Sequence, residues 1–209
     1  MSPMRVTVLG SGTLLPDTAR HSAAHHVVGS GTSVLLDCGS GTLHGFDRSG
    51  IDWASLTHVA ITHYHADHVG DLAPLLFALR NGLRPRRTEP LDVIGPPGFR
   101  GFMERLAAAM GSYVLNPGFP LDVVEVAPDV PYEDPVRGLR IEACPTPHTD
   151  ESVAYRVGLN DEVVGYTGDT GPSEAVASFL EGCGLLLSEC AWSDPCEGSG
   201  HLSPERVSA

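Results

Sequence analysis

Four side chains of the types that bind metal ions lie within six residues of this chain, in the stretch THYHADHVGD. They are His63, His65, Asp67 and His68, called the metal loop below. Neutral imidazole nitrogen and carboxylate oxygen suit Zn(II), Mn(II) or Fe(II). The alternative is a surface loop that is merely rich in histidine, but this spacing at a strand-to-helix junction is more specific than a histidine count. We therefore predict that the loop binds divalent metal ions.

The elements on either side of the metal loop would position its side chains. The run Leu56–Thr62 (LTHVAIT) is apolar enough for a buried strand. His63 and His65, two residues apart in extended chain, would therefore project to the same side. The apolar spacing that follows predicts a helix with Asp67 as its cap and His68 in its first turn. The positive end of the helix dipole would then lie beside the site.

At these residues the chain resembles the metallo-β-lactamase superfamily, whose HxHxDH pattern it carries. Other segments are similar to the ribonuclease Z branch and follow in the expected order: VTVLGSGTLLPDTAR near the N-terminus, LLDCGSGT at 35–42, then TPHTDESVAYRV and VVGYTGDTGP. The resemblance implies one metal on His63, His65 and His148, a second metal on Asp67 and His68, and Asp169 between them. It also implies that Asp37 lies behind the ligands.

The local sequence around His148 and Asp169 is compatible with these implied roles. Two prolines in CPTPHTD fix the backbone after the predicted strand GLRIEAC, so His148 would project from a stiff loop. A solvent-facing histidine is the alternative. Gly168 would let the backbone at Asp169 approach a metal closely, and an ordinary Asx turn is the alternative there. With the metal loop these residues supply enough donors for two metals that each keep a position for solvent.

A histidine and a glutamate near the C-terminus resemble the proton-donating pair of the ribonuclease Z branch. Glu189 lies in SECAW on a late strand, and His201 lies in GSGHLS. The resemblance makes Asp67, Glu189 and His201 the candidate catalytic residues, with His201 as proton donor and Glu189 as its support. The alternatives are that His201 caps the next helix and that Glu189 forms a strand-end salt bridge. His25 and His26 are expected at the surface or behind the ligands.

The end of the chain departs from the family pattern. Enzymes of this type carry a last histidine ligand on a further strand, and no residue after His201 can supply it. Ser203 and Pro204 make a good helix start, yet the residues that follow are too few for a stable isolated helix. This interrupted element predicts a C-terminally truncated chain. The alternative is that His201 itself or a partner chain, as in a homodimer, completes the site.

Strands punctuated by helices along the whole chain predict an α+β protein. We expect strands near 5–9, 25–28, 33–37, 57–62, 91–94, 122–126, 139–144 and 185–189, a hairpin over 153–167 turning at Asn160 and Asp161, and helices from 68, over 99–110 and from 173. Two sheets packed face to face with helices outside form the four-layer αββα sandwich that the resemblance also implies. The hairpin fills the stretch between His148 and Asp169. The long arm with which ribonuclease Z enzymes grip tRNA therefore has no room there.

Composition favours one intracellular domain. The 209 residues, 42% of them hydrophobic, can bury one substantial core and contain no obvious linker, so we expect a single domain over residues 1–209. No apolar run approaches the length of a membrane span and no signal peptide precedes the first strand, which predicts a cytoplasmic protein without a membrane partner. Five cysteines without a CxxC pair indicate reduced thiols.

The formal net charge of −13 argues against broad, non-specific binding of nucleic acid. The chain has no lysine, and four of its 13 basic residues, Arg80, Arg84, Arg86 and Arg87, cluster beyond the helix that follows the metal loop. Guanidinium groups in such a cluster could bind a substrate phosphate. The favoured alternative is a solvated helix end whose cations suit the dipole.

These features predict a metal-dependent hydrolase, most simply a phosphodiesterase that acts through a metal-bridging hydroxide oriented by Asp67 and Asp169. Phosphodiesters are preferred because the likeness is to ribonuclease Z and cyclic-phosphodiesterase branches. The cofactors would be two divalent ions, Zn(II) or else Mn(II) or Fe(II), and the substrate a small phosphodiester or an oligonucleotide. One rival is a ribonuclease Z-type endonuclease that processes tRNA 3′ ends. Another, from a different class, is a catalytically idle metal-binding scaffold.

Overall fold

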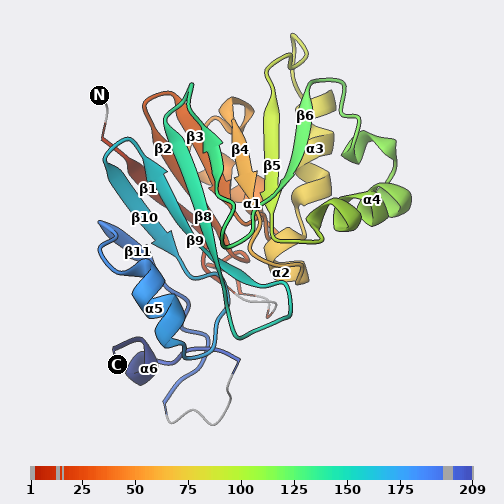
Figure 1. Ribbon diagram of the computed structural model, residues 1–209. Coiled ribbons are helices and arrows are strands. Elements are labelled where there is room, and N and C mark those ends of the chain that lie inside the picture. Colours follow the sequence, from red (N-terminus) through yellow and green to blue (C-terminus); the bar gives the residue numbers. More distant parts are fainter. Residues whose placement is uncertain (1–2, 13–14, 16, 195–199, 209) are drawn as a thin grey trace. The chain divides into compact units, whose positions relative to one another are not determined.

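The structure, a computed structural model, describes residues 3–12, 15, 17–194 and 200–208. The chain divides into two compact units, Met1–Glu125 and Val126–Ala209, each built on its own β-sheet (Figure 1). The expectation of a single domain over residues 1–209 stays a prediction, and the two units are described one at a time. Within the described ranges no helix is both long and apolar enough to cross a membrane.

The first unit is built on a six-stranded sheet whose strands follow chain order. They are β1 (Arg5–Gly10), β2 (Ala24–Gly29), β3 (Thr32–Leu36), β4 (His58–Ala60), β5 (Leu91–Gly95) and β6 (Leu121–Glu125). β1, β2 and β3 pair antiparallel, whereas β3 to β6 pair parallel. Ser30 and Gly31, with φ of 49° and 81°, join β2 to β3 in a two-residue turn. Positive φ at both positions matches the twist of a hairpin.

Helices connect the parallel strands of this sheet. They are α1 (Thr42–Arg48), α2 (Ala66–Val69), α3 (Leu72–Asn81) and α4 (Phe99–Met110), with short 3₁₀ turns η1 (Trp53–Ser55) and η2 (Ser112–Val114). Because parallel strands run the same way, their C-terminal ends meet at one edge of the sheet. Asp37 follows β3 and the metal loop follows β4, so both lie at this edge.

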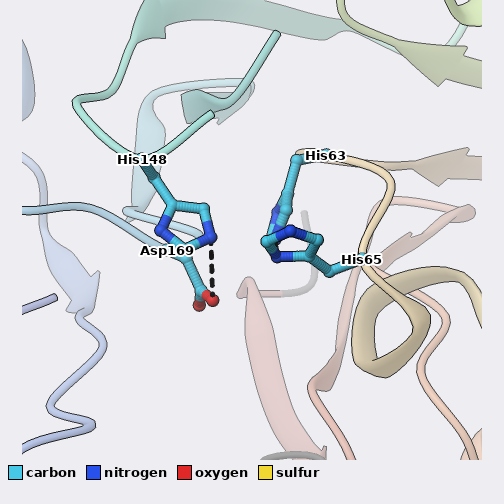
Figure 2. Close-up of side chains that lie close together, drawn as sticks. All are labelled: His63, His65, His148 and Asp169. Carbon is cyan, nitrogen blue, oxygen red and sulfur yellow. Dashed lines mark hydrogen bonds and ion pairs between the residues drawn. The ribbon is translucent and has the colours of Figure 1, made fainter. Parts of the chain in front are cut away.

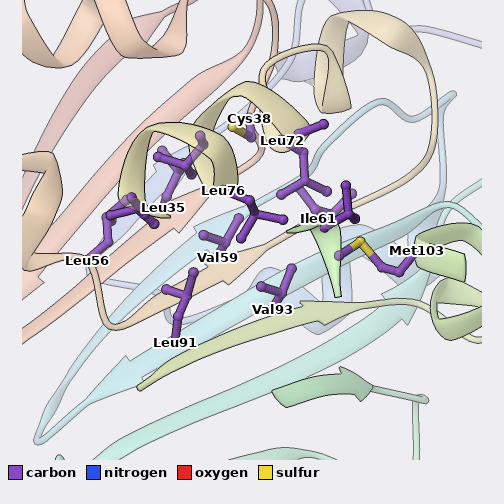
Figure 3. Close-up of a cluster of buried hydrophobic side chains, with 14 of the residues drawn as sticks. Leu35, Cys38, Leu56, Val59, Ile61, Leu72, Leu76, Leu91, Val93 and Met103 are labelled. Carbon is purple, nitrogen blue, oxygen red and sulfur yellow. The ribbon is translucent and has the colours of Figure 1, made fainter. Parts of the chain in front are cut away.

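The core of the first unit is formed by the sheet together with α3 and α4 (Figure 3). α3 buries Leu72, Leu75, Leu76 and Leu79 completely, at the spacing of one helical face. These leucines pack in one cluster with side chains from the strands and from α4: Val59, Ile61, Val93, Phe99 and Met103. Burial of this stripe holds α3, and with it the start of the helical segment next to the metal loop, against the sheet.

The helical segment after the metal loop begins earlier than predicted and is broken. The prediction that Asp67 caps it is wrong, because His65 is the N-cap residue and Asp67 lies in the first turn of α2. α2 ends at Gly70, where a Cβ atom would lie 2.3 Å from Ser40 Oγ. The side chain of Asp71 then accepts hydrogen bonds from two backbone N–H groups around the start of α1. Contacts with a distant segment, not local propensity, therefore shape this junction.

The second unit is built on a five-stranded sheet of order β11-β10-β9-β8-β7. The strands are β7 (Tyr132–Asp134), β8 (Leu139–Pro145), β9 (Val153–Leu159), β10 (Glu162–Tyr166) and β11 (Leu185–Leu187). All neighbours pair antiparallel except β10 and β11, which are parallel. β9 and β10 form the predicted hairpin, and Asn160 at its turn has the positive φ of 56° that such a turn requires. β7 was not expected from the sequence.

Helix α5 (Glu174–Leu180) covers part of the second sheet. A helix was predicted from residue 173, and Ser173 caps it, because its side chain accepts a hydrogen bond from the N–H of Val176 at 3.3 Å. Val176 and Leu180 pack on Ala154 of β9. A last helix, α6 (Pro204–Ser208), begins at the predicted proline.

Two histidines of β2 are buried, so of the two positions expected for them, the surface and a place behind the ligands, the surface is excluded. His25 is 9% exposed and His26 is 2% exposed, because β2 lies between β1 and β3 and both its faces are covered. His26 Nε2 lies 2.8 Å from Ser33 Oγ, and the ring packs edge-on against Phe46 at 5.6 Å between centroids. His26 therefore belongs to the packed interior of the first unit.

The burial of His26 predicts a loss of stability in mild acid. Burial, with a smaller effect of the Arg5 charge, lowers its pKa from the ordinary 6.5 to about 4. The neutral ring is thus favoured in the folded state, so its contribution is complete above pH 6.5 and is lost as the pH falls towards 4. We expect His26 to account for about 2 to 3 kcal/mol of the decrease in the free energy of unfolding across this window.

Urea unfolding between pH 4 and pH 7 measures this contribution. In His26→Gln, the decrease in the free energy of unfolding between pH 7 and pH 4 should be smaller by about 2 to 3 kcal/mol. His44→Gln, at an exposed position, is the control and should show the same decrease as the unchanged protein. An equally steep decrease in His26→Gln and the unchanged protein would contradict the assignment.

Candidate metal centre

The metal loop gathers its four predicted ligands within the first unit. His63 Nε2 lies 3.1 Å from His65 Nδ1, and Figure 2 shows both rings on the loop that leaves β4. The ring centroids of His63 and His68 are 4.1 Å apart, and His68 Nε2 lies 3.9 Å from Asp67 Oδ2. His63 and His68 are buried, whereas His65 is exposed. The described side chains of the metal loop lie close together, and their role as ligands stays a prediction.

Asp37, fully buried after β3, holds this cluster in place. Its carboxylate accepts hydrogen bonds from the backbone N–H and the hydroxyl of Thr62, at 2.7 and 2.9 Å, and Oδ2 lies 2.7 Å from His68 Nδ1. A carboxylate on Nδ1 keeps the proton there and turns Nε2 outward, as is usual for metal-binding histidine. Asp37 has a φ of 56°, which is uncommon for a residue other than glycine. The fold maintains an unfavourable backbone conformation at the residue that orients His68.

The second unit holds the other two predicted ligands side by side. His148 Nε2 lies 3.6 Å from Asp169 Oδ2, the ion pair that is dashed in Figure 2. His148 Nδ1 donates to the backbone carbonyl of Gly200 at 3.0 Å, so the proton resides on Nδ1 and Nε2 is the acceptor that faces Asp169. Thr146 Oγ1 donates to the backbone carbonyl of Asp169 at 2.9 Å and ties the two loops together. Both predicted ligands come from loops that follow strands of the second sheet.

His201 and Glu189 lie next to this pair. His201 Nδ1 is 3.0 Å from Glu189 Oε1 and 3.9 Å from Asp169 Oδ2. One ligand atom from each of these three side chains falls within 4.8 Å of the others. Glu189 also accepts hydrogen bonds from three backbone N–H groups, those of Thr170, Ala191 and Leu202. Glu189 therefore organises the loop around His201, and the contact between the two residues expected from the sequence is present.

Thr62 and Gly200 contact predicted ligands, and the sequence did not indicate either contact. Thr62 Oγ1 lies 3.1 Å from His63 Nδ1, and the Gly200 carbonyl binds Nδ1 of His148 across 52 positions of the chain. Both act on the ring nitrogen that would point away from a metal. Neither could be found from local pattern, because Thr62 reads as the end of a buried strand and Gly200 as part of a flexible glycine-rich stretch.

The residues of both units fit divalent metal ions. His63, His68 and His148 each have Nδ1 in a hydrogen bond to a protein oxygen. Their Nε2 atoms face His65, Asp67 and Asp169, respectively, each within its own unit. Outer partners of this kind are typical of histidines that bind metals. Imidazole and carboxylate together suit borderline and hard divalent cations.

Comparisons with known proteins support this fold. The β-lactamase superfamily domain matches residues 32–209. A ribonuclease Z of Mycobacterium sp. (strain KMS) is 30% identical over 214 residues, which cover 97% of this chain and 73% of that protein. The crystal structure of the metallo-β-lactamase fold protein YhfI from Bacillus subtilis matches with a TM-score of 0.80 at 25% identity, covering 97% of this chain and 78% of that one.

The structure of human short-form tRNase Z matches with a TM-score of 0.78 at 23% identity, over 97% of this chain and 86% of that chain, which supports the fold. The predicted α+β metallo-β-lactamase fold is therefore confirmed, and this fold implies the binding of divalent metal. The chain belongs to the metallo-β-lactamase superfamily, in its ribonuclease Z-like branch, and is a hydrolase of that fold.

Proposed function

We propose that this protein is a dinuclear metallo-hydrolase that cleaves phosphodiesters. The observation that carries the proposal is the orientation of His63, His68 and His148. Each has Nδ1 bound to a protein oxygen, and its Nε2 faces another side chain of the proposed ligand set. A loop that is merely rich in histidine has no reason to maintain a buried carboxylate such as Asp37 behind its rings, at the cost of desolvating that charge. Membership of the ribonuclease Z-like branch supports phosphodiesters as the substrate class.

The proposed ligand set follows the family pattern. His63, His65 and His148 would bind one metal, Asp67 and His68 the other, and Asp169 would lie between them. This assignment treats residues 1–209 as a single working domain. Zn(II) is the first choice for such donors, and Mn(II) or Fe(II) are the alternatives.

Bound metal ions would activate a water and neutralise charge that develops on the phosphoryl oxygens. The chain's own residues would do the rest. The carboxylates of Asp67 and Asp169 would orient the attacking water by accepting its hydrogen bonds. His201 as the imidazolium, with its Nδ1–H on Glu189 at 3.0 Å, would protonate the leaving oxygen from Nε2–H and become the neutral ring. Glu189 is a positioning residue, because its oxygens are already engaged with backbone N–H groups.

The second candidate is a tRNA 3′-processing endonuclease, which is favoured by the curated relatives named ribonuclease Z. Against it stands the short connection between His148 and Asp169, which the β9–β10 hairpin fills, because it has no room for a long RNA-binding arm there. We therefore place a small phosphodiester or an oligonucleotide first. The described cysteines, Cys38, Cys144, Cys183 and Cys190, are all free thiols, which supports a proposed cytoplasmic location. Cys196, also in the expected reduced set, lies outside the described residues.

Turnover of bis(p-nitrophenyl) phosphate tests the proposal. The purified chain should hydrolyse it with added Zn(II) or Mn(II), and removal of metal with EDTA should reduce the rate by a factor of about 10³ or more, since each 1.36 kcal/mol of lost stabilisation is tenfold. Readdition of metal should restore the rate. Absence of turnover with every metal, together with tight metal binding, would instead favour the idle scaffold. Cleavage of precursor tRNA faster than of small diesters would favour the endonuclease.

A further inference from the structure

A pocket of about 100 Å³ in the first unit is lined with arginine and is separate from the metal loop. Its walls include Arg80, Asn81, Arg86, Arg87 and the turn Pro117–Phe119, at the C-terminal end of α3. The metal loop precedes the other end of this helix. α3 has ten residues, so at about 1.5 Å per residue its two ends are roughly 15 Å apart. The pocket is therefore a second place in this unit where charged groups gather.

Arg87 is fixed in the wall of this pocket. It is only 7% exposed, and its guanidinium donates to four backbone carbonyls at 2.7 to 2.8 Å, those of Ala54, Leu56, Glu89 and Pro90. It also lies 5.1 Å from the centroid of the Phe119 ring. Burial lowers the pKa of Arg87 and the nearby Glu89 carboxylate raises it, but arginine stays charged. The four hydrogen-bond partners are uncharged carbonyls, so Arg87 keeps its positive charge beside the pocket, with the Glu89 carboxylate nearby.

The alternative is that the arginines of the pocket only compensate the end of helix α3. Another residue, Arg84, already does so. Arg84 Nη1 donates to the carbonyls of Asn81 and Leu83 at 3.0 and 2.7 Å, and so compensates the negative end of the α3 dipole. Arg80 Nη1 instead donates to Asn116 O at 2.6 Å, at the edge of the pocket. Arg86 is exposed and, among the residues that the structure describes, has neither a hydrogen bond nor an ion pair. Two rim arginines thus have donors that the helix end does not consume.

We propose that this pocket binds a phosphate group, with Arg87 in the wall and Arg80 and Arg86 at the rim. Guanidinium groups match the geometry of phosphate oxygens and bind them with short, charge-assisted hydrogen bonds. A volume of about 100 Å³ admits an oxyanion that displaces a few waters, each of which takes about 30 Å³ of liquid. The phosphate is either a free anion or part of an oligonucleotide backbone, and only the second source rests on the proposed function.

Binding to metal-free protein tests this site independently of hydrolysis. In EDTA, with the Asp67→Ala variant so that no turnover occurs, we would titrate inorganic phosphate by calorimetry and a fluorescein-labelled pentauridylate by anisotropy. Arg86→Gln should weaken the binding of one or both of these ligands by about tenfold, because a charge-assisted hydrogen bond contributes on the order of 1.4 kcal/mol or more. Arg48→Gln removes the same charge from the exposed end of α1, outside the pocket, and should change either affinity less than twofold.

The two ligands distinguish the source of the phosphate. Tenfold weaker binding of inorganic phosphate in Arg86→Gln supports a site for a free anion. The same loss confined to pentauridylate supports a site for the oligonucleotide backbone. In that case the salt dependence of pentauridylate affinity should also decrease, by about the amount that one phosphate contact contributes. Equal affinities of Arg86→Gln and Arg48→Gln for both ligands, or no binding by the parent protein, would overturn the proposal. Arg86 is an exposed side chain without partners among the described residues, so its replacement should not destabilise the fold. Equal melting temperatures of Arg86→Gln and the parent protein check this.

Discussion

Asp67→Ala is expected to lower kcat/KM for bis(p-nitrophenyl) phosphate by about 10³-fold or more with Zn(II) or Mn(II) present. In the proposed role, Asp67 is both a metal ligand and the group that orients the attacking water. Its removal should therefore weaken metal binding and misalign the water. A factor of about 10³ corresponds to about 4 kcal/mol in the activation free energy. Its carboxylate is 13% exposed and lies 3.9 Å from His68 Nε2. Steady-state kinetics beside metal analysis of the purified variant measure both effects.

Asp47→Ala is the matched control for this experiment. Asp47 is an exposed carboxylate of α1 in the same unit, so its loss changes the net charge equally without touching the metal loop. Its kcat/KM should stay within about twofold, as surface substitutions usually do. Full activity of Asp67→Ala, with unchanged metal content, would remove Asp67 from the proposed site. Asp67→Asn should remain impaired, because an amide is a weaker ligand than a carboxylate for these ions.

His201→Ala is expected to lower kcat by about 10² to 10⁴-fold for a dinucleotide with an alkoxide leaving group. The same change should have little effect on bis(p-nitrophenyl) phosphate, because p-nitrophenolate leaves readily without a proton. A proton donor predicts this difference between the two substrates, whereas a residue that only supports the loop predicts equal losses. With its Nδ1–H on Glu189 Oε1 at 3.0 Å, His201 would act as an imidazolium whose Nε2–H is the transferable proton.

Glu189→Gln separates positioning from proton donation. Glutamine can still approach His201 Nδ1 and the surrounding N–H groups but carries no charge, so kcat for the dinucleotide should decrease by a smaller factor than in His201→Ala. His44→Ala, at an exposed site of α1, should leave both substrates unaffected. Equal losses with both substrates in His201→Ala would show that His201 acts on the loop and not on the leaving group.

Much of the fold follows from local pattern. The helix over Phe99–Met110, the helix start at Ser173 and the turn at Asn160 were all predicted, because apolar periodicity, helix-start preferences and tolerance of positive φ act over a few residues. The break between α2 and α3 was not predicted. It depends on how closely Gly70 approaches Ser40, a contact between segments that no local pattern encodes.

For the candidate site, the sequence by itself determined which side chains could bind metal: His63, His65, Asp67 and His68 are neighbours in the chain, so their chemistry is evident from spacing alone. Only the tertiary structure decided how they are oriented. Asp37 reaches His68 from another strand, and Glu189 gathers backbone N–H groups from distant loops. Hydrogen bonds between remote segments, and the burial that makes them strong, exist only once the sheets have formed.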